Sequence, residues 1–185
     1  MGTRGIYGFR KNNEDKLTYN HFDSYPDYLG VKIADFCRTN NLNNLNDIYD
    51  SIIMIDMNKK PTPDQIENCK RWTDLDVSDQ TTSDWYCLLR KAQGDLTAYK
   101  RGLKYMSRDD DFIRHSLFCE YGYIINLDSN ALEFWKGYQR FPQENNRYGT
   151  ETDNGYYPCK LVETFSLNSL PDNIIEIMNE HDSDY

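Results

Sequence analysis

Alternating apolar and polar residues predict β-strands at both ends of this chain. Five segments have this period-two pattern and are bounded by turn residues: 4–10, 16–22, 120–127, 131–138 and 159–167. The first two are joined by KNNED, which is rich in residues that tolerate a left-handed backbone, so they are expected to form a hairpin. The turn DSN joins the third and fourth segments into a second hairpin.

Between the strands, apolar residues recur at the three- and four-residue spacing of helices. The first two predicted helices run from Pro26 to Cys37 and from Leu45 to about Met57. The third begins at Pro63, where Thr62 and Gln65 form a capping box. The fourth runs from a cap at Ser83 to Gly94, and the fifth covers 95–106 with a stop near Gly102. A last short helix covers 170–180, and 181–185 form a solvent-exposed tail.

This order of elements predicts an α+β fold, in which an antiparallel sheet of about five strands is covered by a block of helices. Neither a repeat nor a linker divides the chain, so residues 1–185 are expected to form a single domain. Its parts are the N-terminal hairpin 4–22, the helical block 26–118, the C-terminal strands 120–167 and the C-terminal helix 170–180.

The net charge of the chain limits the kinds of partner that it can bind. A net charge of -9 over 185 residues repels phosphate backbones, which argues against general nucleic-acid binding. A small anionic ligand then needs a local group of cationic side chains. No apolar run is long enough for a membrane span, and the N-terminus has no signal-peptide pattern, so we expect a cytoplasmic protein that does not enter the membrane.

Cysteine and histidine spacing gives no sign of a metal or a disulfide framework. The five cysteines are widely spaced and odd in number, which is typical of reduced, buried thiols. His115, Cys119 and Glu120, together with His21, match no ligand spacing of a known kind of metal site. We therefore expect neither a metal nor a cofactor.

The stretch LTYNHFDSYP (17–26) gathers polar and aromatic side chains where the first hairpin meets the first helix. Alternation places Tyr19 and His21 on one face of their strand, and Asp23 and Ser24 fall at a helix start, whose free N–H groups favour anions. Aromatic and arginine side chains together suit a nucleotide-like ligand, with the base stacked and the phosphate held. The candidate ligand-binding residues are Arg4 and Arg10 from the partner strand, with Tyr19, Asn20, His21, Asp23, Ser24 and Tyr25.

Two other interpretations of this stretch remain open. Asp23 or Ser24 can simply cap the helix while Tyr19 and His21 hydrogen-bond within the fold. Alternatively, His21 can act as a base that Asp23 orients, although the sequence assigns no serine or cysteine nucleophile to that pair.

The segments TRGIYGFRKN and YNHFDSYPDYLG resemble the start of a family of small, largely uncharacterised proteins of bacteriophages and bacteria. EYGYIINLDSNALEFWKGY resembles a second signature of that family, so the resemblance covers about residues 3–30 and 120–138. It implies a phage origin and hence the cytoplasm of a host cell, and it carries no established biochemistry.

A second resemblance is one of topology. The order of hairpin, helices and hairpin is similar to that of N-terminal-nucleophile hydrolases, in which the first residue of the mature chain attacks the substrate. This chain begins Met1-Gly2-Thr3, so removal of Met1 would expose a glycine without a nucleophile, and Thr3 would require a further cleavage. Catalysis of that kind is therefore in doubt.

Three functions follow as hypotheses. The first is a non-enzymatic protein that captures a small anionic or nucleotide-like ligand, with a host immune signal of the nucleotide type as one class. The second is a hydrolase of an amide or a phosphodiester, and the third is an interaction module that inhibits a host enzyme. The sequence favours binding over catalysis, and it is compatible with a homo-oligomer.

Overall fold

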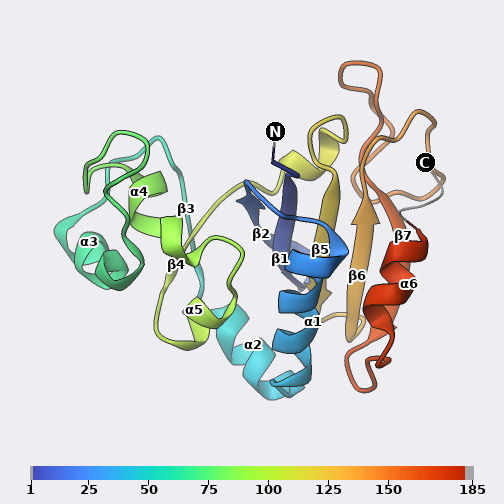
Figure 1. Ribbon diagram of the computed structural model, residues 1–185, viewed down its shortest axis with the longest axis horizontal. Helices are drawn as coiled ribbons and strands as arrows, with labels where there is room; N and C mark the ends of the chain where they lie inside the picture. Colours follow the sequence, from blue (N-terminus) through green and yellow to red (C-terminus); the bar gives the residue numbers. More distant parts are fainter. Residues whose placement is uncertain (1, 182–185) are drawn as a thin grey trace.

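The computed structural model of the chain describes residues 2–181 and is built around one five-stranded sheet (Figure 1). Met1 and residues 182–185, which belong to the predicted tail, lie outside the described residues. The strands are β1 (Gly5–Lys11), β2 (Glu14–Asn20), β5 (Tyr121–Asn126), β6 (Ala131–Lys136) and β7 (Lys160–Ser166). All five predicted strands are confirmed, as is the α+β class.

The strand order is β2-β1-β5-β6-β7, and one neighbouring pair is parallel. β1 and β5 run in the same direction, with Gly5 opposite Tyr121 and Arg10 opposite Asn126, whereas the other three pairs are antiparallel. The sheet is mostly antiparallel, as predicted, and departs from the prediction only in the β1–β5 pair. Parallel neighbours need a long crossover connection, and the helical block between β2 and β5 supplies it.

The helical block contains short helices joined by turns. These elements are η1 (Pro26–Gly30), α1 (Val31–Arg38), α2 (Leu42–Ser51), α3 (Pro63–Cys69), η2 (Lys70–Trp72), α4 (Trp85–Leu89), η3 (Arg90–Ala92), α5 (Thr97–Lys100) and η4 (Phe112–Arg114), and α6 (Ile174–Glu180) follows the last strand. The capping box of Thr62 and Gln65 is present, but the cap of α4 is Asp84 and not Ser83. The Asp84 carboxylate accepts a hydrogen bond from the Tyr86 N–H, which the Ser83 hydroxyl does not.

The block also holds two strands that were predicted to be helical. β3 (Ile53–Ile55) pairs in parallel with β4 (Tyr105–Ser107), and the Ile53 N–H donates to the Lys104 carbonyl at 2.7 Å. The helix expected to reach Met57 ends at Ser51, and the one expected over 95–106 ends at Lys100. β3 and β4 lie with α3 and α4 in a side lobe (residues 53–107), beside the β2 edge of the sheet (Figure 1).

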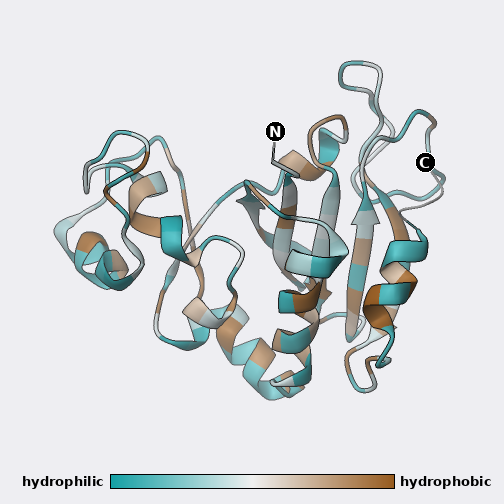
Figure 2. Ribbon diagram, viewed as in Figure 1, coloured by the Kyte–Doolittle hydropathy of each residue, from teal (hydrophilic) through white to brown (hydrophobic). Residues whose placement is uncertain are grey.

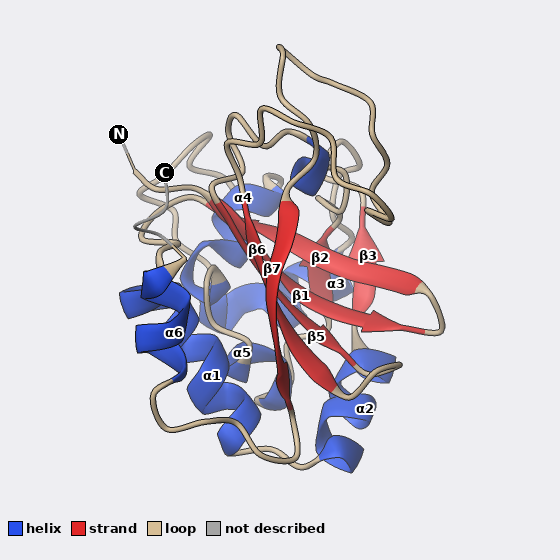
Figure 3. Ribbon diagram, turned by 90° about the vertical axis from the view of Figure 1, so that its right-hand side faces the viewer, coloured by secondary structure: helices blue, strands red, loops and turns tan. Residues whose placement is uncertain are grey.

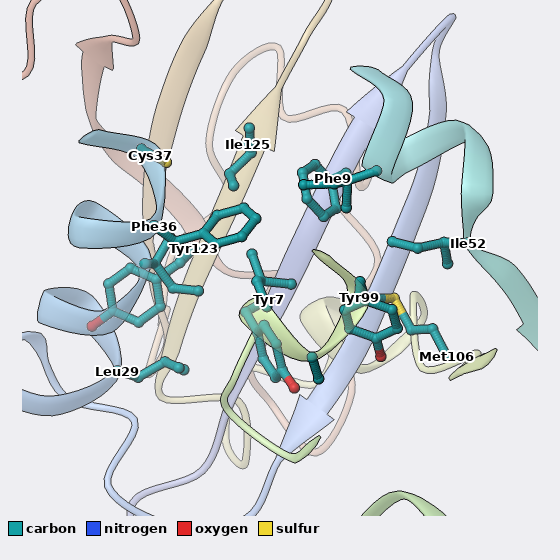
Figure 4. Packing of buried hydrophobic residues seen from close by; sticks show 14 of the residues in the cluster. Tyr7, Phe9, Leu29, Phe36, Cys37, Ile52, Tyr99, Met106, Tyr123 and Ile125 are labelled. Atoms are coloured by element: carbon teal, nitrogen blue, oxygen red, sulfur yellow. The ribbon is translucent and has the colours of Figure 1, made fainter. Parts of the chain in front are cut away.

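The two faces of the five-stranded sheet are covered differently. The helix face, which includes Tyr7, Phe9 and Tyr123, packs against the helices, with α1 and α6 on one side of the sheet (Figures 3 and 4). The loop face, which includes Ile6 and Trp135, packs against η4 and the long loop between β6 and β7, residues 137–159. That loop is largely hydrophilic in Figure 2. The stretch 17–26 covers the last residues of β2, which is an edge strand of the sheet, and the turn that follows it.

Candidate functional site

The stretch 17–26 begins in β2, and its second half is a tight turn that Asn20 organises. β2 ends at Asn20, whose buried side chain donates hydrogen bonds to the Phe22 carbonyl and to Ser24 Oγ at 2.8 Å. The chain then turns at Asp23, which adopts a left-handed φ of 53°, a conformation that aspartate tolerates better than most residues. Most polar groups of the turn are thus used inside the fold.

Neither Asp23 nor Ser24 caps the following helix, so the predicted capping role is wrong. η1 begins at Pro26 behind Tyr25, and no side-chain cap hydrogen bond is formed there. Ser24 is fully buried and ties the turn to the sheet, because its N–H donates to Thr3 and its carbonyl accepts from the Tyr123 hydroxyl at 2.9 Å. Because Pro26 has no N–H, this helix start also offers an anion fewer N–H donors than the sequence led us to expect.

Tyr19 and His21 satisfy each other, as the purely structural interpretation predicts. The Tyr19 hydroxyl is hydrogen-bonded to Nδ1 of His21 at 2.8 Å, and the Tyr19 ring packs edge-on against Phe112 of η4. Burial, with the nearby positive charges of Arg90 and Arg4, lowers the pKa of His21 below 6.5. The imidazole is therefore neutral near pH 7.

The two predicted arginines lie at opposite ends of β1. Six residues of extended chain separate Arg4 from Arg10 by about 20 Å. The Arg4 guanidinium lies 5.0 Å from the Phe118 ring centre, and its charge helps to lower the pKa of His21. Arg10 is paired with Asp15 at 2.8 Å near the other end of the hairpin. The prediction that Arg10 belongs to this site is wrong.

A hollow of about 220 Å³ lies against the turn, and we call it the turn hollow. Its lining consists of Asn20, Phe22, Asp23, Tyr28, Leu29, Lys32, Arg90, Gln93 and Gly94. Asn20 and Asp23 are the predicted residues that reach it. The other chemically important groups are the cations Lys32 and Arg90 and the aromatic rings of Phe22 and Tyr28, which are 46% and 53% exposed. The Arg90 guanidinium lies 5.7 Å from the centre of the Phe22 ring.

A second, narrower space shares Arg90 and Gln93 with the turn hollow, and we call it the inner cleft. It has a volume of about 80 Å³ and lies between the β2 edge and the side lobe. Its aromatic lining comprises Tyr7, Tyr19, Trp85, Tyr86 and Tyr99, of which Tyr7 and Tyr99 lie close together in Figure 4. Burial raises the pKa of Tyr7 far above its ordinary value, so this phenol stays protonated.

The polar wall of the inner cleft is a chain of hydrogen bonds that ends at Asp109. The hydroxyls of Thr18 and Ser107 are bonded to each other at 2.6 Å, and Ser107 donates to Asp109 Oδ2 at 2.7 Å. The same oxygen accepts from the Tyr19 N–H at 3.1 Å, and the Thr18 hydroxyl, whose proton is used in the shorter bond to Ser107, lies 3.4 Å from it. The wall is therefore fixed in place by buried hydroxyls and by the free edge of β2.

These two spaces offer cationic, aromatic and hydrogen-bonding groups, which is the chemistry of a binding site. Over residues 2–181, no histidine is hydrogen-bonded to a serine, threonine or cysteine, and no three metal-binding side chains gather in a group that could hold an ion. The five cysteines are all free and buried. None of the described helices has the length and apolar character needed to cross a bilayer.

Part of this site had a local signal in the sequence. Tyr28 and Lys32 are four residues apart and therefore share one side of the helical segment, next to the predicted turn. Arg90 and Asp109 follow the turn by more than sixty residues, and only the crossover through the side lobe brings them to it.

Comparisons with protein-family models, with curated proteins and with solved structures found no match to this chain. The resemblances to phage proteins and to N-terminal-nucleophile hydrolases therefore stay expectations. The candidate site rests on its geometry alone.

Proposed function

We propose that this protein binds a small anionic, nucleotide-like ligand at the turn hollow and releases it unchanged. The observation that carries the proposal is the meeting of two cations, Lys32 and Arg90, with the exposed rings of Phe22 and Tyr28 around one hollow, in a chain of net charge -9. Ammonium and guanidinium groups hold phosphate, and exposed aromatic faces stack on bases.

The charge environment supports an anion in this hollow. Neither Lys32 nor Arg90 forms an ion pair with any carboxylate in residues 2–181, whereas Arg10, Arg38, Arg101, Arg108, Arg114 and Arg147 each do. Arg90 is also positioned by a hydrogen bond to Gln93 Oε1 at 3.3 Å, which reduces the conformational entropy lost when it binds a ligand. Asp23 offers an acceptor for the hydroxyls of a sugar.

The resemblance to phage proteins supports a more specific form of the proposal. In that form the protein is phage-encoded, acts in the cytoplasm of the host and sequesters a nucleotide-type immune signal. Sequestration requires tight binding without turnover, which agrees with the lack of a histidine paired with a serine, threonine or cysteine among residues 2–181.

The proposal is tested by capture and release. The protein is mixed with a panel of mononucleotides and cyclic dinucleotides, freed of unbound ligand by desalting and denatured, and the released compounds are analysed by mass spectrometry. We expect unaltered nucleotide to be recovered from the wild type and lost from the Lys32→Ala/Arg90→Ala variant.

The matched control is Lys60→Ala/Arg71→Ala, which removes the same charge from exposed positions outside both spaces. If the control lost as much ligand, the change in net charge alone would explain the effect, and this result would contradict the proposal. Recovery of a cleaved nucleotide would favour the hydrolase instead, and no retention by the wild type would leave the interaction module as the better hypothesis.

A further inference from the structure

We infer that the inner cleft receives the ring of the same ligand and that Asp109 selects a ring that carries an amino group. This inference rests on the proposed function, because it assigns the part of the ligand that extends beyond the anionic group. It goes further in naming the specificity-determining residue and the chemical class that the residue accepts.

The first step is that the two spaces adjoin each other, because they share part of their lining. Arg90 and Gln93 line both the turn hollow and the inner cleft, and they are hydrogen-bonded to each other at 3.3 Å. A phosphate that contacts Arg90 in the turn hollow therefore leaves the rest of its molecule at the mouth of the cleft. The volumes of about 220 Å³ and 80 Å³ suit a sugar phosphate outside and the edge of one ring inside.

The second step is the surroundings that a ring would meet in the cleft. Tyr19, Trp85 and Tyr86 offer aromatic surface, and the indole N–H of Trp85 is already bound to the Lys59 carbonyl at 2.7 Å. The indole therefore contributes its apolar surface and has no free donor. Stacking on such surfaces does not distinguish one base from another, so discrimination has to come from the polar wall.

The third step is the acceptor on that wall. The Ser107 hydroxyl and the Tyr19 N–H both donate to Oδ2 of Asp109, the Thr18 hydroxyl also lies nearest to Oδ2, and Oδ1 has no hydrogen-bond donor among residues 2–181. An ionised carboxylate can only accept. A ring amino group can donate to this oxygen, whereas a ring carbonyl at the same place sets two acceptors against each other and leaves both unsatisfied once water is displaced.

The test compares ligands that differ at this group and, with it, at the neighbouring ring nitrogen, which carries a proton in IMP and UMP and none in AMP and CMP. Binding of AMP and IMP, and of CMP and UMP, is measured by titration calorimetry with wild-type protein. We expect the amino-bearing member of one or both pairs to bind about tenfold more tightly, the ratio that one hydrogen bond supplies. In Asp109→Asn, whose amide can donate as well as accept, we expect the ratio to fall to about one, mainly through weaker binding of the amino-bearing nucleotide.

Asp110→Asn is the matched control, because Asp110 is the adjacent carboxylate and lies outside both spaces. It should keep the wild-type ratio. Thermal melting of Asp109→Asn checks that the hydrogen-bonded wall survives, and if that variant does not fold, the two wild-type ratios still decide the question. Equal binding within both pairs would overturn the inference while leaving the proposed function intact. No binding of any nucleotide would overturn both.

Discussion

The two faces of the central sheet are both buried, but they are stabilised in different ways. On the helix face, Tyr7, Tyr123 and Phe134 are almost fully buried against apolar side chains of the helices. On the loop face, Glu133 is only 4% exposed and accepts hydrogen bonds from Arg147 at 2.8 and 2.5 Å. The same carboxylate accepts from Asn126 at 2.7 Å and from the Trp135 indole at 3.0 Å.

The difference reflects what each covering can offer. A helix satisfies its own backbone groups and presents an apolar side, so it stabilises mainly through buried area. A long loop such as 137–159 has free backbone groups that need partners. It is held by side-chain ties, such as Asn146 to the Cys159 carbonyl at 2.9 Å and His115 to Asp153 at 2.6 Å. The helix face should therefore respond to changes in volume, and the loop face to the loss of one partner.

The largest effect is expected on the helix face. Phe134 is fully buried and stacks on Tyr123 with ring centres 5.4 Å apart. Phe134→Ala should lower the free energy of unfolding by about 3–5 kcal/mol, measured by denaturant unfolding at equilibrium. Phe134→Leu keeps more of the volume and should cost less than half as much. Equal losses in the two variants would show that volume is not what this face requires.

A somewhat smaller effect is expected on the loop face. Glu133→Leu leaves Arg147 without its carboxylate and should cost about 3 kcal/mol, the low end for a broken buried pair, because 24% of the Arg147 side chain is exposed. Adding Arg147→Met removes the unpaired charge and should recover part of that loss. Purely additive losses in the double-mutant cycle would mean that the pair is not coupled, and the contrast between the faces would fail.

The turn at the end of β2 should be intermediate. Asn20→Ala removes the donor to two acceptors, the buried Ser24 Oγ and the partly buried Phe22 carbonyl, and should cost about 2 kcal/mol in unfolding free energy. Asp23→Asn is the control, because asparagine also tolerates the left-handed φ at that position and should change stability little. A neutral Asn20→Ala would show that the turn does not depend on its buried amide.

The smallest effect concerns pH. Because burial lowers the pKa of His21 in the folded protein, the unfolded chain takes up this proton first as the pH falls. The contribution of His21 is therefore complete above about pH 6.5 and is lost progressively below it. We expect an NMR titration midpoint for His21 below 6.5 and a weaker acid dependence of stability in His21→Gln. A midpoint above 6.5 would contradict the neutral pairing with Tyr19.

Much of the fold was predictable because most strands carry their own local pattern. The alternation in 120–138 and the turn between its halves are enough to predict the hairpin of β5 and β6. The parallel pairing of β1 with β5 was not predictable, because alternation is the same in both strand directions. β3 was missed because a short apolar run such as 52–55 fits a buried helix as well as a strand.

The site was predictable only in its location. Asn20 and Asp23 line the turn hollow, and the density of polar residues around them in the sequence was what indicated a site there. Ser24 and His21 belong to the same dense stretch, but their groups are used by Tyr123 and Tyr19. The sequence could not distinguish these cases, because each partner is decided by the packing of the sheet and not by spacing along the chain.

The parallel pairing of β1 with β5 also sets an order of events during synthesis. The hairpin of β1 and β2 can form as soon as residues 5–20 have left the ribosome, but the other edge of β1 stays unpaired until residues 121–126 follow. At typical elongation rates of about 5–20 residues per second, that edge waits for about 5–20 seconds. Exposed strand edges recruit other strands. Charged residues at the hairpin tip, Arg10, Lys11 and Glu14, would limit such encounters while the nascent chain is incomplete.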